Sequence, residues 1–499
     1  MLTEAGCPAS AEIRPVNWRI IKMENIRLKI GLAGGVHPNM PGDDEALYRR
    51  VAGEFETLAE SFGFDLVLES DPLRSEEDSE KAVRRFNDEE VDLTLFFSAS
   101  LPYGRTALPL AGLRSAIGIW AVPEPVSEGV LQLNSYCGLN MFGSILRNYF
   151  PGEDIKYKWF YGMPSSGLFR DRLSVTLGAL RAVKKLKNAR IGQIGELADG
   201  FENLYIDERE LRRKFGTRLQ SRHTVEDIVK LAKSYSISEL DALAEEIRAE
   251  GRWSPRLSKA DFEKFVRLNR AFFDFAEDNR YDSLAVSCWS KFQEVWDVAV
   301  CGVLSRLNSA GIAAPCEADV SSAVCMLILN AVNGEVSSLN DLVALDEDDG
   351  SLCLWHCGVA AGCWADSCGI CWDSHFNIGE WDGARWNGRG VVADLSYKAT
   401  ELTVFNMQNG FDNLFILSGE VMPGKKGYAG SGGWVDNLRI NGSPAAIPEL
   451  INTVSVGRVN HHYPSAFGNL TDPLNELAFW KDLNVVDKVP YRNYMQKFI

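Results

Sequence analysis

The 499-residue chain is long enough for two to four domains of ordinary size. Its 46% hydrophobic and 24% charged residues are typical of a globular protein, and its net charge of -16 argues against nucleic acid or an anionic membrane as a partner. The first 25 residues lack an apolar stretch long enough for a signal peptide, and no run of about 18 apolar residues predicts a membrane span. We therefore expect a cytoplasmic protein that acts on a small molecule.

Strand and helix patterns alternate from residue 26 onward. The strand-like run "IRLKIGLAG" is followed by the helical segment "DDEALYRRVAGEFETLAESFG", and then by the strand-like runs "FDLVLES", "VDLTLFFSAS" and "SAIGIWAVPEP". This order predicts a parallel sheet covered by helices. The glycines of "GLAGG" lack a full phosphate-binding fingerprint, so a tight turn is expected there in preference to a nucleotide site.

A second α/β region begins with "ARIGQIG" and includes the strand-like run "YDSLAVSCW". Two apolar helices are expected at "EVWDVAVCGVLSRLNSAG" and "EADVSSAVCMLILNAVNG", each ended by a glycine. Beyond "LDEDDG", alternating runs such as "GVVADLSY", "ELTVFNM" and "NLFILSGEV" predict β-structure, interrupted by an expected Gly-rich loop "GYAGSGGWVDN".

The predicted fold class is α/β, with two successive Rossmann-like domains followed by a β-rich, barrel-like C-terminal domain. The expected boundaries give an N-terminal extension (1–25), an N-terminal α/β domain (26–184), a central α/β domain (185–345) and the β-rich domain (346–499).

Five cysteines lie close together in the sequence: Cys353, Cys357, Cys363, Cys368 and Cys371. Structural zinc sites usually combine two close cysteine pairs across a longer loop, and this spacing does not fit that pattern. Buried core thiols are therefore expected, with a zinc or iron-sulfur site as the alternative.

Histidines and carboxylates offer a different kind of site. His461 and His462 are adjacent in "VNHHYPSAFG", and in a strand they would face opposite ways, so that one could bind a metal. Glu317 in "APCEADV" stands near a helix N-terminus, which favours an ionised carboxylate; the competing interpretation is that Glu317 or Asp319 only caps that helix. Asp341, taken by itself, is predicted to be an aspartate in a loop.

The order of these segments resembles the L-fucose isomerase and L-arabinose isomerase superfamily. The resemblance rests on "PCEADV", "NDLVALDEDDGSLCLWHCG", "LFILSGEV" and "VNHHYPSAFGN", and on "ARIGQIGELADGFENLYIDERELRRKFG" at the start of the central domain. It extends over most of the chain from about residue 26. The Asp at the second carboxylate position is similar to the fucose branch, whereas the HH pair is shared with the arabinose branch.

The resemblance implies an aldose-ketose isomerase that binds a divalent metal, usually manganese. Glu317 and Asp341 match the two carboxylate ligands that also move the proton, and His462 matches the histidine ligand. His356 in "LWHCG" matches a further ligand of the arabinose branch, or else orients one. The metal would polarise the carbonyl and stabilise a cis-enediolate between O1 and O2.

Sugar recognition and assembly follow from the same resemblance. Planar and amide side chains suit a sugar, and the candidates are Trp434, Gln293, Trp289, Asn460 and His461. The family assembles as trimers or hexamers with active sites between subunits, so a homo-oligomer is expected. Two alternatives remain: a non-catalytic sugar-binding protein, and an isomerase of a modified sugar such as a sulfonated hexose.

Overall fold

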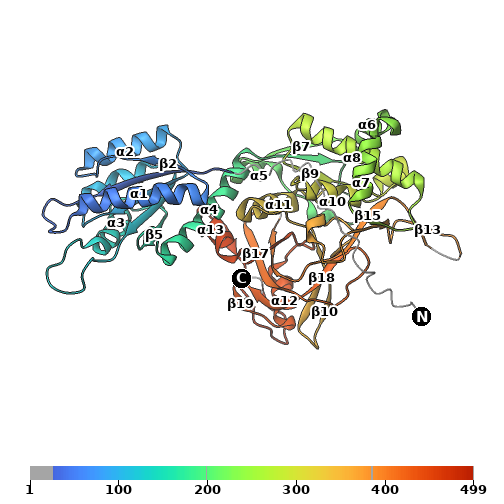
Figure 1. Cartoon of the computed structure of the whole chain (residues 1–499). Helices are drawn as coiled ribbons and strands as arrows, with labels where there is room; N and C mark the ends of the chain where they lie inside the picture. Colours follow the sequence, from blue (N-terminus) through green and yellow to red (C-terminus); the bar gives the residue numbers. More distant parts are fainter. Residues whose placement is uncertain (1–25, 198, 384–385, 409, 498–499) are drawn as a thin grey trace. The chain divides into compact units, whose positions relative to one another are not determined.

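The structure is a computed structural model that describes residues 26–197, 199–383, 386–408 and 410–497. The predicted extension 1–25 lies outside these residues. Contacts group the described residues into one compact unit of residues 26–184 and a second that continues from residue 185. The further boundary predicted between residues 345 and 346 falls inside the second unit. The model is a mixed α/β structure with parallel sheets and a β-rich C-terminal region (Figure 1).

The unit of residues 26–184 is built on a five-stranded parallel sheet in the order β2-β1-β3-β4-β5. Its strands are β1 (Lys29–Gly35), β2 (Asp65–Leu68), β3 (Leu93–Ser98), β4 (Ala116–Ala121) and β5 (Tyr157–Tyr161). Its helices are α1 (Asp44–Phe62), α2 (Glu76–Asp88), the 3-10 helix η1 (Gly104–Gly112), α3 (Ser135–Tyr149) and α4 (Gly167–Asn188), the last of which ends beyond residue 184. The predicted alternation of strands and helices is confirmed, and the strand order is that of a doubly wound sheet.

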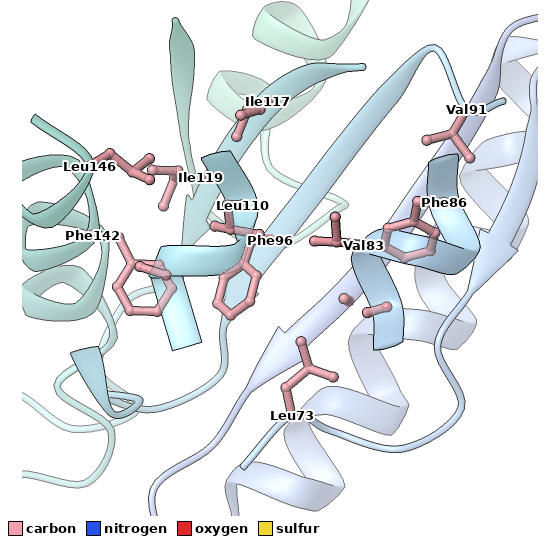
Figure 2. Close-up of a cluster of buried hydrophobic side chains, with 13 residues drawn as sticks. Leu73, Val83, Phe86, Val91, Phe96, Leu110, Ile117, Ile119, Phe142 and Leu146 are labelled. Atoms are coloured by element: carbon pink, nitrogen blue, oxygen red, sulfur yellow. The ribbon is translucent and has the colours of Figure 1, made fainter. Parts of the chain in front are cut away.

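Helices cover both faces of this sheet. One face packs against α2, η1 and α3 through a cluster of buried apolar side chains, in which Figure 2 shows the ring of Phe96 beside that of Phe142. The other face carries aromatic contacts between α1, α4 and β4, in which the Trp120 and Phe169 ring centroids lie 4.2 Å apart. The continuously apolar strands of the sequence reflect burial on both faces.

The glycines of "GLAGG" do not form the expected turn. All five residues belong to β1, and the chain leaves the sheet only after Gly35. A side chain at Gly34 would collide with the ring of Tyr48 on α1, so the glycine permits close packing of helix on sheet.

Helix α2 begins with a capping box. The Ser75 hydroxyl accepts the Asp78 backbone N–H at 3.1 Å, and the Asp78 carboxylate accepts the Ser75 N–H at 3.1 Å. We expect Ser75→Ala to destabilise α2 by about 1 kcal/mol. Native-state hydrogen exchange of the α2 amides measures this, and Ser75→Thr should restore the wild-type rates; equal exchange in the Ala variant would contradict the role of the cap.

The unit that begins at residue 185 combines a small parallel sheet with a large mixed sheet. The parallel sheet has the order β7-β6-β9, and the mixed sheet follows the path β20-β16-β17-β18-β15-β12-β8, with β11 paired to β18 and β10 paired to β11. The strands are β6 (Arg190–Ile194), β7 (Arg218–His223), β8 (Arg252–Trp253), β9 (Ser283–Val286), β10 (Asp341–Asp346), β11 (Ser351–His356), β12 (Cys371–Ser374), β13 (Gly379–Trp381), β14 (Trp386–Gly388), β15 (Val391–Ser396), β16 (Glu401–Met407), β17 (Asn413–Val421), β18 (Ser431–Ile440), β19 (Ser443–Pro444), β20 (Ser465–Phe467) and β21 (Asn484–Val485).

The helices of this unit are η2 (Glu202–Leu204), α5 (Glu208–Phe215), α6 (Val225–Ser234), η3 (Ile237–Leu240), α7 (Asp241–Ala249), α8 (Lys259–Asn279), α9 (Lys291–Trp296), α10 (Cys301–Ser309), α11 (Val320–Asn333), η4 (Gly362–Trp364), α12 (Ile447–Gly457) and α13 (Thr471–Lys481). The helix predicted before Gly334 is confirmed as α11. The one predicted over "EVWDVAVCGVLSRLNSAG" is wrong as a single element, because the chain breaks at Asp297 in the left-handed region and resumes as α10. The predicted Gly-rich loop "GYAGSGGWVDN" is largely strand β18.

Candidate active site

Strand pairing places Asp341 next to His462. Asp341 begins β10 and forms an isolated antiparallel bridge with His462, which is 121 residues away in the sequence. The Asn340 carbonyl accepts the Tyr463 N–H at 2.6 Å, and the Asn406 amide donates to the His462 carbonyl at 2.7 Å. The expectation that Asp341 lies in a loop is therefore wrong, because the backbone of Asp341 is held in the sheet.

Glu317 reaches the same place from the end of the parallel sheet. The Ala318 N–H donates to the carbonyl of Val286, the last residue of β9, at 3.0 Å. Glu317 and Ala318 both have positive φ, at 61° and 56°, in the segment between α10 and α11. Such backbone is costly for residues with side chains and is often found at functional sites. The Glu317 Oε2 atom lies 3.2 Å from Nε2 of His462 and 3.6 Å from Nε2 of His461.

Asp319, not Glu317, caps helix α11. Its carboxylate accepts the Ser322 backbone N–H at 3.0 Å and the Ser322 hydroxyl. The same carboxylate lies 2.7 Å from Nδ1 of His462, and both side chains are buried. The capping interpretation thus applies to Asp319 alone, which leaves Glu317 free to face the histidines. Sequence reasoning missed the contact of Asp319 with His462; the only signal was an aspartate two residues beyond Glu317.

The Asp319 contact fixes the form of the His462 ring. A neutral imidazole that donates Nδ1–H to Asp319 has a bare lone pair at Nε2, and this atom faces the Glu317 carboxylate oxygen. Two lone-pair atoms 3.2 Å apart repel each other unless a proton or a cation lies between them. A carboxylate, a histidine and a metal are arranged in this way in many metalloproteins.

Several buried polar atoms around this point have no hydrogen-bond partner among the described residues. They are Oε2 of Glu317, Oδ1 of Asp341 and the Nε2 atoms of His356, His461 and His462. Unpaired buried polar atoms are costly and rare, and here they converge from five residues. Glu317, His356 and His462 each place one donor atom within 4.8 Å of the others, and so do Asp341, His461 and His462. Oxygen and imidazole donors of this kind fit a divalent cation of the manganese class.

Protons compete with a cation for this site. Burial lowers the pKa of His462, but the neighbouring carboxylates of Asp319 and Glu317 outweigh burial and raise that pKa to about 10. Burial raises the pKa of Glu317, yet the neighbouring imidazoles of His461 and His462 hold it below its usual range. For Asp341, burial dominates and raises the pKa. A cation that binds here therefore releases protons.

His356 faces the same cluster from the end of β11. Its Nδ1 atom accepts the Cys357 N–H at 2.9 Å and lies 3.3 Å from the Cys357 sulfur, which leaves Nε2 directed at the carboxylates. Burial lowers the pKa of His356, but the charges of Cys357 and Asp341 outweigh it and raise the pKa to about 9. With Nδ1 as acceptor, a neutral ring carries its proton on Nε2 and can donate it. The ring could ligate a cation through Nε2 only in the other tautomer, in which Nδ1–H faces the Cys357 sulfur.

The expectation that His461 and His462 face opposite ways is wrong. They lie in a loop, with the exception of the bridge at His462, and their ring centroids are 4.2 Å apart. The His461 Nδ1 atom lies 2.9 Å from the Asn203 amide nitrogen, a contact that sequence reasoning missed. The side chain of His461 is 38% exposed and that of His462 is 1% exposed, so His461 stands on the solvent side of the pair.

The structure separates the predicted sugar-binding residues. Trp289 is 43% exposed and follows Cys288, whose sulfur contacts Cys316 beside Glu317. The Gln293 amide nitrogen donates to the carbonyls of Cys288 and Val298 at 3.1 and 3.2 Å. These hydrogen bonds stabilise the loop and use the amide nitrogen that a sugar hydroxyl would need.

Asn460 is half-buried next to His461. Trp434 lies elsewhere: its indole donates to the Lys426 carbonyl at 3.0 Å and stacks under Lys425, which binds Ser351. Ser351 is at the opposite end of β11 from His356. Packing therefore accounts for the contacts of Trp434.

The expected group of core thiols is only partly observed. Cys353 is buried, whereas Cys363 is exposed and Cys368 and Cys371 are half-buried. Cys357 contacts the sulfur of a distant cysteine, Cys301, at 3.4 Å. Sequence proximity was therefore a poor guide to which cysteines cluster.

Fold and geometry together place a cluster of carboxylates and imidazoles where the parallel sheet and the mixed sheet meet. Over 409 residues the chain is 26% identical to a sulfoquinovose isomerase of Priestia aryabhattai, covering 80% of this chain and 86% of that protein. It is also 26% identical to the sulfoquinovose isomerases of Alkalicoccus urumqiensis (74% of this chain, 80% of that protein) and Clostridium sp. strain MSTE9 (72% and 78%).

No protein-family model matches the chain. Among solved structures, a solute-binding protein of an ABC transporter from Agrobacterium vitis covers 62% of this chain and 90% of its own at 12% identity. Its TM-score is 0.16, which carries no conclusion about fold or function.

Proposed function

We propose that the chain is an aldose-ketose isomerase that acts on a sulfonated hexose of the sulfoquinovose type. The observation that carries the proposal is the convergence of Glu317, Asp341 and His462 on one point where their buried donor atoms lack partners. The relatives named sulfoquinovose isomerase support both the reaction and the sulfonated substrate. We further place the chain in the L-fucose and L-arabinose isomerase superfamily, as a branch with a modified substrate.

Glu317, Asp341 and His462 would hold the cation, which we propose to be manganese, with His356 or His461 completing the set. When bound there, a divalent cation supplies Lewis-acid stabilisation of negative charge on neighbouring sugar oxygens. His462 presents Nε2 to the cluster because Asp319 holds Nδ1–H, and the sheet holds Asp341 in place.

Glu317 and Asp341 form the proton-transferring pair. Isomerisation removes a proton from C2 of the aldose and returns one to C1, while a proton moves between O2 and O1. A carboxylate next to the sugar chain can accept the first proton and give it back at the neighbouring carbon. Both carboxylates meet this need. Each has an oxygen close to His462, and among the described residues neither forms a salt bridge with Lys or Arg.

Three of the candidate sugar-binding residues are partly open to solvent: His461, Asn460 next to it, and Trp289 just after Cys288. We propose that the sugar enters here, with the exposed Trp289 ring against its C–H face and the Asn460 amide near its hydroxyls. The open side also suits completion by another subunit, as in a trimeric or hexameric assembly. In the described part of the chain, no helix is long and apolar enough to cross a membrane. A cytoplasmic location remains part of the proposal.

Activity on defined aldoses tests the proposal. The full-length chain is stripped with a chelator, reloaded with manganese, and incubated with sulfoquinovose, L-fucose, L-arabinose or D-arabinose, and ketose formation is followed by nuclear magnetic resonance. We expect turnover of sulfoquinovose that is lost on stripping and regained with manganese. Faster turnover of an unmodified sugar would overturn the substrate class, and no ketose from any of the four would overturn the isomerase itself.

A further inference from the structure

Four cysteine sulfurs gather beside the carboxylate-imidazole site. Cys288 follows β9, Cys301 begins α10, Cys316 precedes α11 and Cys357 follows β11, so four separate segments supply them. The sulfurs of Cys288 and Cys316 lie 2.7 Å apart, and those of Cys301 and Cys357 lie 3.4 Å apart. The sulfurs of Cys316 and Cys357 lie within 4.8 Å of each other, which links the two pairs. All four are free thiols, and we call them the thiol cluster.

Two imidazoles border the thiol cluster. A ring nitrogen of His375 lies within 4.8 Å of the Cys301 and Cys357 sulfurs, and one of His356 lies within 4.8 Å of the Cys316 and Cys357 sulfurs. The His375 Nδ1 atom accepts the N–H groups of Asn377 and Ile378 at 3.0 and 2.9 Å. The proton of a neutral His375 ring is therefore on Nε2, which makes this ring a hydrogen-bond donor and not a ligand.

Ordinary packing does not account for the cluster. A cysteine used as a small core hydrophobe contacts carbon atoms at about 3.5–4.0 Å. Cys353 is such a residue: it is buried on β11, and the partner of its thiol is the backbone carbonyl of Leu354. In the cluster, sulfurs face one another and imidazoles, and sulfur and imidazole are the donors that a cation of the zinc class prefers.

We propose that Cys288, Cys301, Cys316 and Cys357 form a second metal site, which binds a divalent cation of the zinc class through thiolates. Thiolates prefer such cations, whereas the neighbouring carboxylates and imidazoles prefer a harder cation such as manganese. The two sites would therefore bind different cations. Each thiol that becomes a ligand releases its proton to solvent, and no redox change is involved.

Two sulfur-sulfur distances can be compared with those of a zinc site. Zinc-sulfur bonds of about 2.3 Å in a tetrahedron put neighbouring sulfurs about 3.8 Å apart. The separation of 3.4 Å between Cys301 and Cys357 is close to this, and the 2.7 Å between Cys288 and Cys316 has to widen by rotation about the Cα–Cβ bonds. Cys357 is half-buried, whereas Cys288, Cys301 and Cys316 are buried.

The thiol cluster shares its backbone with the proposed catalytic site. Cys316 directly precedes Glu317, and Cys357 directly follows His356. A cation that ties Cys316 to Cys357 would therefore fix the chain on both sides of the site. The cluster would act as a structural support for two residues that the isomerase reaction needs.

Cobalt(II) tests the assignment on the full-length chain. Cobalt bound by thiolates gives intense sulfur-to-cobalt charge-transfer absorption in the near ultraviolet, whereas cobalt bound by carboxylates and imidazoles does not. We expect this absorption to appear with one equivalent of cobalt per chain at saturation, and zinc to abolish it by displacement. Glu317→Gln should keep the absorption, which separates this test from that of the isomerase.

Matched serine variants identify the ligands. Cys301→Ser and Cys357→Ser should each weaken the absorption, whereas Cys353→Ser, at a buried cysteine outside the cluster, should leave it unchanged. Circular dichroism checks that each variant folds. Wild-type protein without charge-transfer absorption at saturating cobalt would overturn the proposal, as would equal absorption in Cys301→Ser, or a thiol titration that finds Cys288 and Cys316 joined as a disulfide under reducing conditions.

Discussion

Glu317→Gln is expected to lower kcat/KM for the proposed isomerisation by roughly 10²- to 10⁴-fold, the range that a positioned acid-base group contributes. The amide is nearly the same size as the carboxylate but can neither take a proton from carbon nor supply a negative oxygen to a cation. The loss should be larger than that of a surface charge because Oε2 of Glu317 is buried against Nε2 of His462 and has no hydrogen-bond partner. Steady-state kinetics and a manganese titration measure the two effects.

Glu335→Gln is the matched control for this variant. Glu335 is exposed just beyond the C-terminal end of α11, so the same chemical change there should leave kcat/KM and manganese affinity unchanged. The two readouts also separate the possible roles of Glu317. Loss of rate with full manganese affinity would assign it to proton transfer alone, and wild-type values for both would remove it from the site.

Sequence patterns predicted secondary structure correctly where an element depends on residues that are close together in the sequence. The apolar runs of residues 26–184 could be read as buried parallel strands, and the Gly334 stop of α11 was visible, because both depend on residues close in sequence. The prediction of a single long helix across Asp297 was wrong. Asp297 adopts the left-handed backbone conformation, and the composition of the surrounding apolar run does not indicate this.

The candidate site depended on contacts that no local pattern encodes. Residue types suggested Glu317 and His462, and only the family resemblance picked out Asp341. Their approach depends on a bridge between β10 and a loop 121 residues away. Likewise, the cysteines that cluster come from positions 288, 301, 316 and 357, whereas the sequence drew attention to positions 353–371.

Asp319→Asn is expected to weaken manganese binding and kcat/KM by roughly 10- to 100-fold, the usual effect of losing the partner of a metal-bound histidine. Asparagine caps helices about as well as aspartate, so the start of α11 should hold. If the amide oxygen keeps the cap on the Ser322 N–H, the amide NH₂ faces Nδ1 of His462. The ring must then carry its proton on Nε2, the atom that a cation needs.

Ser322→Ala is the control that distinguishes this tautomer effect from loss of the cap network. It removes the hydroxyl that donates to Asp319 but keeps the carboxylate facing His462, so manganese affinity should stay near the wild-type value. Electron paramagnetic resonance of free manganese measures affinity, and thermal unfolding monitors the fold in the same samples. An Asp319→Asn protein that binds manganese as tightly as wild type would mean that His462 does not ligate through Nε2, and the geometry would then leave Asp341 and His461 as the donors next to Glu317.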